Sequence, residues 1–329
     1  MIYLEDFRFP DWKVEEKYIT NCIKDGISDY YLESIYPFYV LSGKDFYCMD
    51  FEPITLLYGG NGCGKSTALN VIAQKLNVQR NSAFNSSYWM KEYVNFCLCH
   101  VNNRYSGGEY FTRQDRDAQF DISSITKMLT SDDIFNMMQR KRVKNEQTIV
   151  KSKILHEDRR LARKMPFDTP RRLDFETGQG VQEYIDKLQL RRGSFNQLMR
   201  TKIGKIEQGM SNGETSLMEL NGLIQEPGLY ILDEPENSLA SDFQRKLAQI
   251  IEYAAKYCDA QFIIATHSPF LLSLPGAKIY SFDTVPVSIQ NWWELENMQQ
   301  MFQLFEEYRD KFIDSSKQNI MTATKCQFD

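Results

Sequence analysis

The residues with the clearest capacity for chemistry lie between Gly59 and Thr67, in the segment GGNGCGKST. The spacing Gly-x4-Gly-Lys-Ser is the phosphate-loop pattern, in which glycines let the backbone wrap around phosphate oxygens with its N–H groups turned inward. We expect Lys65 to neutralise the β and γ phosphates, Ser66 to ligate Mg²⁺ and Thr67 to reach the α phosphate. The residues predicted to line the phosphates are Gly59, Gly60, Asn61, Gly62, Cys63, Gly64, Lys65, Ser66 and Thr67.

A pair of carboxylates forms the second candidate group. Asp233 and Glu234 follow directly on the apolar run GLYIL at residues 228–232. Two adjacent carboxylates at a strand end repel each other unless a cation or a reacting water uses them. We therefore predict that Asp233 holds Mg²⁺ through water and that Glu234 polarises the attacking water. A solvated acidic turn is the alternative interpretation of such a pair.

Three apolar runs must position these groups. ITLLYGG at residues 54–60 is followed by apolar residues at helical spacing, which predicts a strand, a loop and a helix. The runs at 228–236 and 261–269 also end in polar residues, and the last of these runs carries His267. Buried strands with polar carboxyl ends are typical of an open α/β sheet, whose ligands gather at that edge.

The segment QGMSNGETS at residues 208–216 lies upstream of the acidic strand. A helix start with a hydroxyl and unobstructed amides is an anion site. The segment resembles the signature motif of ABC-type ATPases, which Ser211, Gly213 and Glu214 match residue by residue. The resemblance implies that Ser211 and Gly213 contact the γ-phosphate of ATP bound to another subunit, and that His267 is the switch histidine of the family.

This resemblance covers residues 1–78 and 205–290. It implies an α/β P-loop NTPase fold of the ABC-ATPase type, with a mostly parallel central sheet, an antiparallel β portion and a helical insertion. It also implies an ATPase that uses ATP and Mg²⁺, with Glu234, His267 and Lys65 as catalytic residues. The form DEPENSL resembles the branch that contains the SMC and OLD-type ATPases, because residues 236–240 lack the Asp that transporter subunits carry there.

Two elements of the family have several candidates in this sequence. The candidates for the Gln-bearing loop are Gln114, or Ser131 and Asp132. The candidates for the aromatic residue that stacks on adenine are Tyr36, Phe38 and Tyr47.

The chain between the first two strands is too long for a simple crossover. We predict a discontinuous ATP-binding core at 1–80 and 205–329, and an inserted, mainly helical and basic region at 81–204. Residues 139–205 hold 18 Lys and Arg against 8 Asp and Glu, a balance of +10 in a chain whose net charge is −5. We expect a few helices with mobile connections there, beginning near the capped start SDDIF. This basic segment is a candidate nucleic-acid site, and a solvated face or a protein-binding arm is the alternative.

The composition is that of a globular protein, with 42% apolar and 25% charged residues. No apolar stretch reaches the roughly 18 residues of a membrane span, and the acidic start is unlike a signal peptide. The seven cysteines are odd in number and scattered, which favours reduced thiols in the cytoplasm. The run VNFCLCH, ending at His100, is predicted to be a buried strand, with a zinc site as the alternative for Cys97, Cys99 and His100. Cys63 is either a redox switch or a small tolerated side chain.

A final amphipathic helix is predicted after a last strand near residue 278. Its apolar residues 301, 302, 304, 305, 308 and 312 fall on one face. We expect this face to pack into the core, and the alternative is that Trp292 and Trp293 anchor a partner.

These features together predict ATP-driven homodimerisation as a mechanochemical switch, in nucleic-acid-linked defence or repair. Two alternatives stay open: a nucleotide-binding subunit of a transporter, and a regulatory ATP switch that acts on a partner protein. No nuclease constellation stands outside the ATP site, so any effector activity would come from an effector protein.

Overall fold

The computed structural model describes residues 1–80, 82–102, 110–111, 122–164, 212–237 and 239–313, together with Ile185, Leu188, Leu190 and Ser194. The chain divides into two compact units. The first comprises Met1–Ile134 and Leu217–Asp329, and the second comprises Phe135–Ser216. The core boundaries predicted at residues 80 and 205 stay a prediction.

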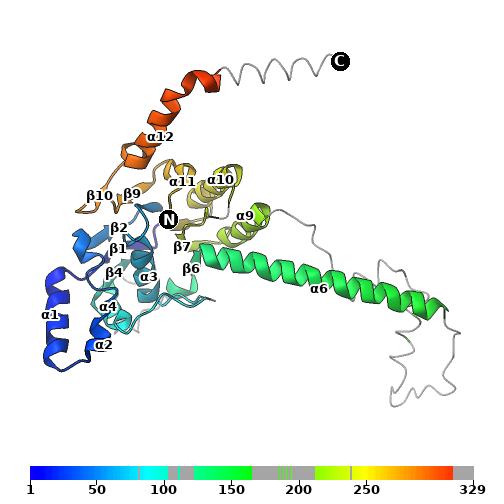
Figure 1. Cartoon of the computed structure of the whole chain (residues 1–329), viewed down its shortest axis with the longest axis horizontal. Coiled ribbons are helices and arrows are strands. Elements are labelled where there is room, and N and C mark those ends of the chain that lie inside the picture. Colours follow the sequence, from blue (N-terminus) through cyan, green and yellow to red (C-terminus); the bar gives the residue numbers. More distant parts are fainter. Residues whose placement is uncertain are drawn as a thin grey trace. The chain divides into compact units, whose positions relative to one another are not determined.

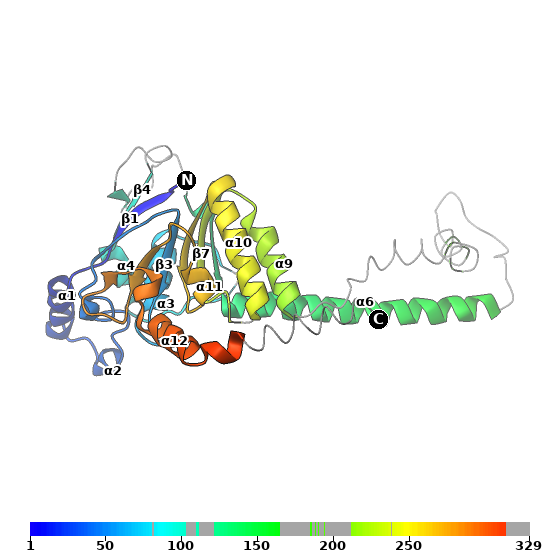
Figure 2. The same cartoon turned by 90° about the horizontal axis from the view of Figure 1, so that it is seen from above.

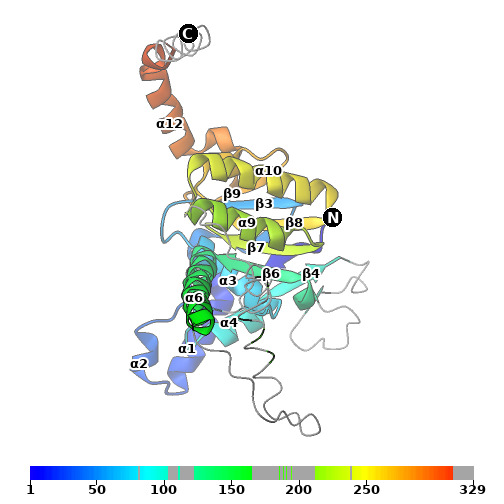
Figure 3. The same ribbon diagram turned by 90° about the vertical axis from the view of Figure 1, so that its right-hand side faces the viewer.

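A six-stranded sheet forms the centre of the first unit (Figure 1). Its strand order is β10-β9-β3-β8-β7-β6, and Figure 3 shows β9, β3, β8, β7 and β6 following one another in this order. All neighbours pair in parallel except β10, which is antiparallel to β9. The strands are β3 (Ile54–Tyr58), β6 (Thr126–Thr130), β7 (Gly228–Asp233), β8 (Ala260–Ala265), β9 (Lys278–Ser281) and β10 (Ser288–Ile289).

A second sheet is antiparallel and has the order β2-β1-β4-β5. Its strands are β1 (Leu4–Arg8), β2 (Cys48–Asp50), β4 (Leu98–Val101) and β5 (Tyr110–Phe111). The expected α/β class, with a mostly parallel central sheet and an antiparallel portion, is therefore confirmed.

Helix α3 (Lys65–Lys75) lies between the two sheets. Its residues Leu69, Val71 and Ile72 are fully buried in one hydrophobic cluster with side chains from both sheets. Figure 2 shows α10 (Ser241–Tyr257) on the opposite face of the central sheet from α3. The other helices of the first unit are α1 (Trp12–Lys24), α2 (Asp29–Leu32), α4 (Met90–Phe96), α11 (Pro269–Leu272) and α12 (Glu296–Glu307). Because α3 is enclosed on two sides, the loop that precedes it is held firmly at the edge of the sheet.

Helices α6 (Ser131–Lys164) and α9 (Asn212–Ile224) each cross from one unit to the other. The predicted helix start at Ser131 is confirmed, and Asp132 and Asp133 complement the positive end of α6. The expectation of a few helices with mobile connections is wrong up to Lys164, because α6 is a single helix of 34 residues. It contains neither Gly nor Pro, so nothing in its backbone interrupts it.

The segment around Cys97 and His100 also differs from the prediction. Residues 90–96 are helical as α4, and the strand begins only at Leu98, because Met90, Tyr93 and Val94 pack into the core at the i, i+3, i+4 spacing of a helix. Cys97 and Cys99 are buried, and burial raises the pKa of Cys99 to about 12. The two thiols thus pack as apolar side chains, which supports the structural interpretation over a zinc site.

Helix α12 is present as predicted, but its apolar face does not pack into the core. Leu295 and Met298 are buried at its start, whereas Phe302 and Phe305 are 60% and 55% exposed. Trp293 is also exposed. The buried start fixes where the helix leaves the sheet, and the residues beyond it extend past the core. Within the described part of the chain, no helix combines the length and the apolar character needed to cross a membrane.

Candidate nucleotide site

The phosphate-loop segment connects β3 to α3 at the carboxyl edge of the central sheet. Gly59 and Gly64 have φ angles of 150° and 108°, a region that favours glycine. A Cβ at Gly59 would also lie 2.8 Å from the Cys63 sulfur, so a side chain there would collide. Gly64 is the N-cap of α3, and no side chain caps the helix at that position. The first amides of α3 therefore face the loop, as a phosphate cradle requires.

Lys65 lies almost buried at the start of α3, with 4% of its surface exposed. Its Nζ donates to the carbonyl oxygens of Gly59 and Gly60, the latter at 3.1 Å. The same Nζ lies 3.0 Å from Nε2 of His267. The ammonium group is thus held over the loop by its own backbone, and the fold brings two of the predicted catalytic residues together.

Ser66 and Asp233 also meet, although they are far apart in the sequence. The Ser66 hydroxyl donates to Oδ1 of Asp233 at 3.1 Å. Burial raises the pKa of Asp233 to about 6, the nearby Glu234 charge adds to this, and the bond from Ser66 opposes it. A hydroxyl and a carboxylate are oxygen ligands of the kind that Mg²⁺ prefers. The donor set therefore fits the predicted magnesium site.

Glu234 stands in an unusual backbone conformation, with a φ of +49°. A non-glycine residue in this region is strained, and such strain concentrates at functional sites. Its Oε2 accepts a hydrogen bond of 2.7 Å from the Asn237 side chain, and its Oε1 lies 3.5 Å from Nε2 of His267. The imidazole of His267 therefore lies within reach of both Lys65 and Glu234. This arrangement can orient a water against a bound phosphate.

Two contacts of the site were not foreseen from the sequence. Oδ1 of Asp283, just beyond β9, accepts a 2.7 Å hydrogen bond from the Gly60 amide. Asn237 orients Glu234, as described above. The pairing of β9 with β3 places Asp283 beside the loop, and no local pattern in the sequence reveals that pairing.

The remaining predicted residues divide into three groups. Ser211 and Gln114 lie outside the described residues. Gly213 and Glu214 lie in the first turn of α9 and belong to the second unit, while Ser131 and Asp132 begin α6.

Among the candidates for the aromatic residue that stacks on adenine, Phe38 is buried and stacks on Tyr18 in the core, which leaves Tyr36 and Tyr47. The roles of all these residues stay predictions.

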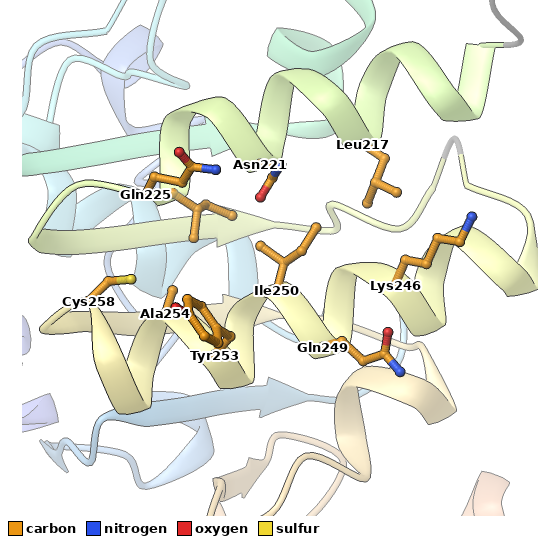
Figure 4. A pocket seen from close by; sticks show the side chains of 10 residues that line it. Leu217, Asn221, Gln225, Lys246, Gln249, Ile250, Tyr253, Ala254 and Cys258 are labelled. Carbon is orange, nitrogen blue, oxygen red and sulfur yellow. The ribbon is translucent and has the colours of Figure 1, made fainter.

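A groove of about 630 Å³ lies elsewhere in the first unit, between α9 and α10 (Figure 4). Leu217 and Ile224 line it from α9, and Ile250 and Tyr253 line it from α10. None of the predicted phosphate, metal or catalytic residues contributes to it. We therefore assign the candidate nucleotide site to the carboxyl edge of the central sheet and not to this groove.

Two protein-family models match segments of the chain that form this site. A family model described as "ABC transporter" matches residues 47–237, more than half of the chain. A second model, described as "AAA domain, putative AbiEii toxin, Type IV TA system", matches residues 208–273. A search of curated proteins finds no significant match.

Solved structures of Smc head domains are among those similar to the chain. An Smc head with an extended coiled coil, bound to the C-terminal domain of ScpA from Pyrococcus furiosus, is 13% identical, with a TM-score of 0.38. The match covers 80% of this chain and 95% of that chain. An SmcHead bound to the C-winged helix domain of ScpA is 12% identical, with a TM-score of 0.43, and the match covers 77% of this chain and 94% of that chain.

These identities and TM-scores are low, so the assignment rests on the family match and on the sheet topology. The "ABC transporter" model spans both the phosphate-loop segment and the acidic end of β7. The chain therefore belongs to the ABC family of P-loop ATPases, whose general activity is the binding and hydrolysis of ATP.

Proposed function

We propose that this chain is an ATP-gated homodimer, in which two subunits enclose two ATP molecules and hydrolysis releases the subunits. One observation carries the proposal. The chain holds both a phosphate loop and a segment that resembles the ABC signature, Ser211 to Glu214. In an ABC-type subunit these two elements do not bind the same nucleotide, so each site needs the signature segment of a second copy.

The geometry at the sheet edge supports a role for each residue in hydrolysis. Lys65 neutralises the β and γ phosphates, and Ser66 and Asp233 hold the Mg²⁺ ion of the bound nucleotide. Mg²⁺ supplies charge neutralisation and orientation for the transferred phosphoryl group. Glu234 polarises the attacking water and accepts its proton, and His267 contacts the γ-phosphate.

The shared site can be tested by mixing two inactive variants. Lys65→Ala removes the phosphate contact but keeps the signature segment, whereas Ser211→Arg blocks the signature segment but keeps the phosphate loop. A mixed dimer holds one intact site, built from the loop of the Ser211→Arg chain and the signature of the Lys65→Ala chain. We expect the mixture to hydrolyse ATP faster than the sum of the separate variants. A mixture no more active than that sum contradicts the shared site.

A nucleic acid is the ligand that we propose for the basic segment 139–205. Lys144, Lys151 and Lys153 are exposed on α6, where their ammonium groups can contact phosphates. Each phosphate contact releases counterions, so affinity for DNA or RNA should fall steeply between roughly 50 and 200 mM salt.

The paired change Lys151→Glu with Lys153→Glu should weaken this binding by at least about tenfold, measured by fluorescence anisotropy at low salt. The control is Lys13→Glu with Lys17→Glu on α1, which alters the net charge equally and should leave the affinity nearly unchanged. Equal losses in both variants would indicate a general charge effect. If the protein binds neither DNA nor RNA at low salt, the nucleic-acid proposal is wrong, and the alternative is that the basic segment is a protein-binding arm.

Two other hypotheses compete with this proposal. A transporter subunit would co-purify with a membrane protein, and the missing Asp after Glu236 disfavours it. A regulatory switch would bind ATP with turnover near zero and act on an effector protein. The exposed apolar face of α12 offers such a partner a contact surface. We also propose, from the scattered cysteines, that the protein is located in the cytoplasm.

A further inference from the structure

Glu236 is a buried acid with a role that the site described above does not explain. It lies in the turn after β7 and is 6% exposed. Its Oε1 accepts three hydrogen bonds: from the Thr266 hydroxyl at 2.5 Å, from the His267 amide at 2.7 Å and from the Ser268 amide at 3.1 Å. One carboxylate oxygen thus holds three consecutive residues of the loop that follows β8.

This contact joins two loops that leave the same edge of the sheet. Strands β7 and β8 are parallel neighbours, and Asp233 pairs with Ala265 at their ends. Beyond that point the Glu234 amide donates to the Ala265 carbonyl at 2.9 Å. The loop after β8 is also tied to α10, because the Ser268 hydroxyl donates to the Gln244 side chain at 2.8 Å. Glu236 therefore stands at the centre of the network that fixes the backbone of His267.

Burying a carboxylate in a protein is unfavourable unless hydrogen bonds compensate for its lost hydration. The bonds to an ionised oxygen are stronger than neutral ones, so they hold the amides of His267 and Ser268 in one geometry. The second oxygen, Oε2, is also buried and has no polar partner among the described residues. Among the described residues, all the hydrogen bonds that the Glu236 carboxylate accepts thus come from the loop that carries His267.

We propose that Glu236 is a positioning residue, which sets the imidazole of His267 between Lys65 and Glu234. Within the described part of the chain the Glu236 carboxylate makes no hydrogen bond or ion pair with Lys65, Ser66 or Asp233, so we infer that it acts on the site through His267. This inference depends on the proposed function in one respect, because it takes His267 as the residue that contacts the γ-phosphate. The proposal that Glu236 positions the imidazole of His267 does not depend on ATP hydrolysis.

A double-mutant cycle tests the catalytic part of this claim. We expect Glu236→Ala to lower kcat by at least about tenfold while the ATP affinity changes by less than about threefold. In a His267→Ala background the same change should lower kcat by less than about threefold, because the residue through which Glu236 acts is gone. Glu236→Gln, which keeps the shape and one acceptor oxygen, should recover part of the rate. Losses that multiply in the double variant would overturn the proposal.

NMR of the histidine side chains tests the placing of the imidazole without any activity. The chain has only three histidines, so the His267 signal is assigned by its absence in His267→Ala. We expect Glu236→Ala and, to a smaller extent, Glu236→Gln to shift the His267 signal, while the signals of His100 and His156 stay in place. An unchanged His267 signal in a folded Glu236→Ala protein refutes the inference, even if the protein hydrolyses ATP.

Glu15 supplies a matched control. It is also a buried carboxylate, and its Oε2 accepts from the Ser42 hydroxyl at 2.6 Å and the Tyr39 amide at 2.8 Å, away from β8. Glu15→Ala should lower thermal stability but leave the His267 signal where it is. If wild-type protein shows no ATP hydrolysis, the proposed function fails, and the NMR comparison still decides the role of Glu236.

Discussion

Glu234→Gln is expected to reduce the rate of ATP hydrolysis by at least about 100-fold, because an amide cannot accept the proton of the attacking water. The amide preserves the size of the side chain, so nucleotide binding should persist. ATP that binds without being hydrolysed should then hold the two subunits together. We therefore expect the variant to run as a dimer with saturating ATP and as a monomer without it, measured by sizing with light scattering.

Glu226→Gln is the control for this change. Glu226 is an exposed acid in the same unit, paired with Lys127 at 2.6 Å and remote from the predicted site residues. Its substitution should leave both hydrolysis and assembly unchanged. Two results would contradict the role of Glu234: a hydrolysis rate close to that of wild type, or a protein that stays monomeric at saturating ATP.

Lys65→Ala is expected to weaken ATP binding by at least about 100-fold, which corresponds to about 2.7 kcal/mol. The reason is that Lys65 supplies the buried positive charge above the loop, held there by the carbonyls of Gly59 and Gly60. Titration calorimetry with Mg·ATP measures the affinity. In a thermal melt, the stabilisation that ATP confers on wild type should disappear, because a ligand stabilises a protein only as far as it binds.

Lys24→Ala controls for the loss of one positive charge, since Lys24 is exposed at the end of α1. It should bind ATP like wild type. If Lys65→Ala retained the wild-type affinity, the loop would not hold the phosphates in the predicted way. The comparison of melting temperatures without ATP shows whether the variant is folded.

The sequence predicted those parts of the nucleotide site that are formed by short, continuous segments of the chain. The loop from Gly59 to Thr67 is one continuous segment, and its conformation depends on glycines at fixed positions. Three apolar runs ending in polar residues sufficed to predict parallel strands with their polar ends at one edge. The prediction that Lys65, Asp233 and His267 share a site follows from that rule, and the contacts at this edge agree with it.

The partners of each side chain at this edge depended on strand order, which the periodicity of a sequence does not encode. Because β9 lies beside β3, Asp283 reaches the amide of Gly60. Because β8 lies beside β7, Glu236 reaches the amide of His267, 31 positions away in the chain. A hydrophobic pattern indicates that a strand is buried, but it is the same whichever strand lies next to it.

The sequence by itself therefore determined the phosphate loop, the acidic strand end and the α/β class, because each depends on residue types at short, fixed spacing. Only the tertiary structure decided that His267 lies between Lys65 and Glu234, that α6 continues to Lys164, and that the apolar face of α12 is exposed. The physical reason is that amphipathic spacing specifies which face of a helix is apolar, whereas the surface that covers this face is specified by the rest of the fold.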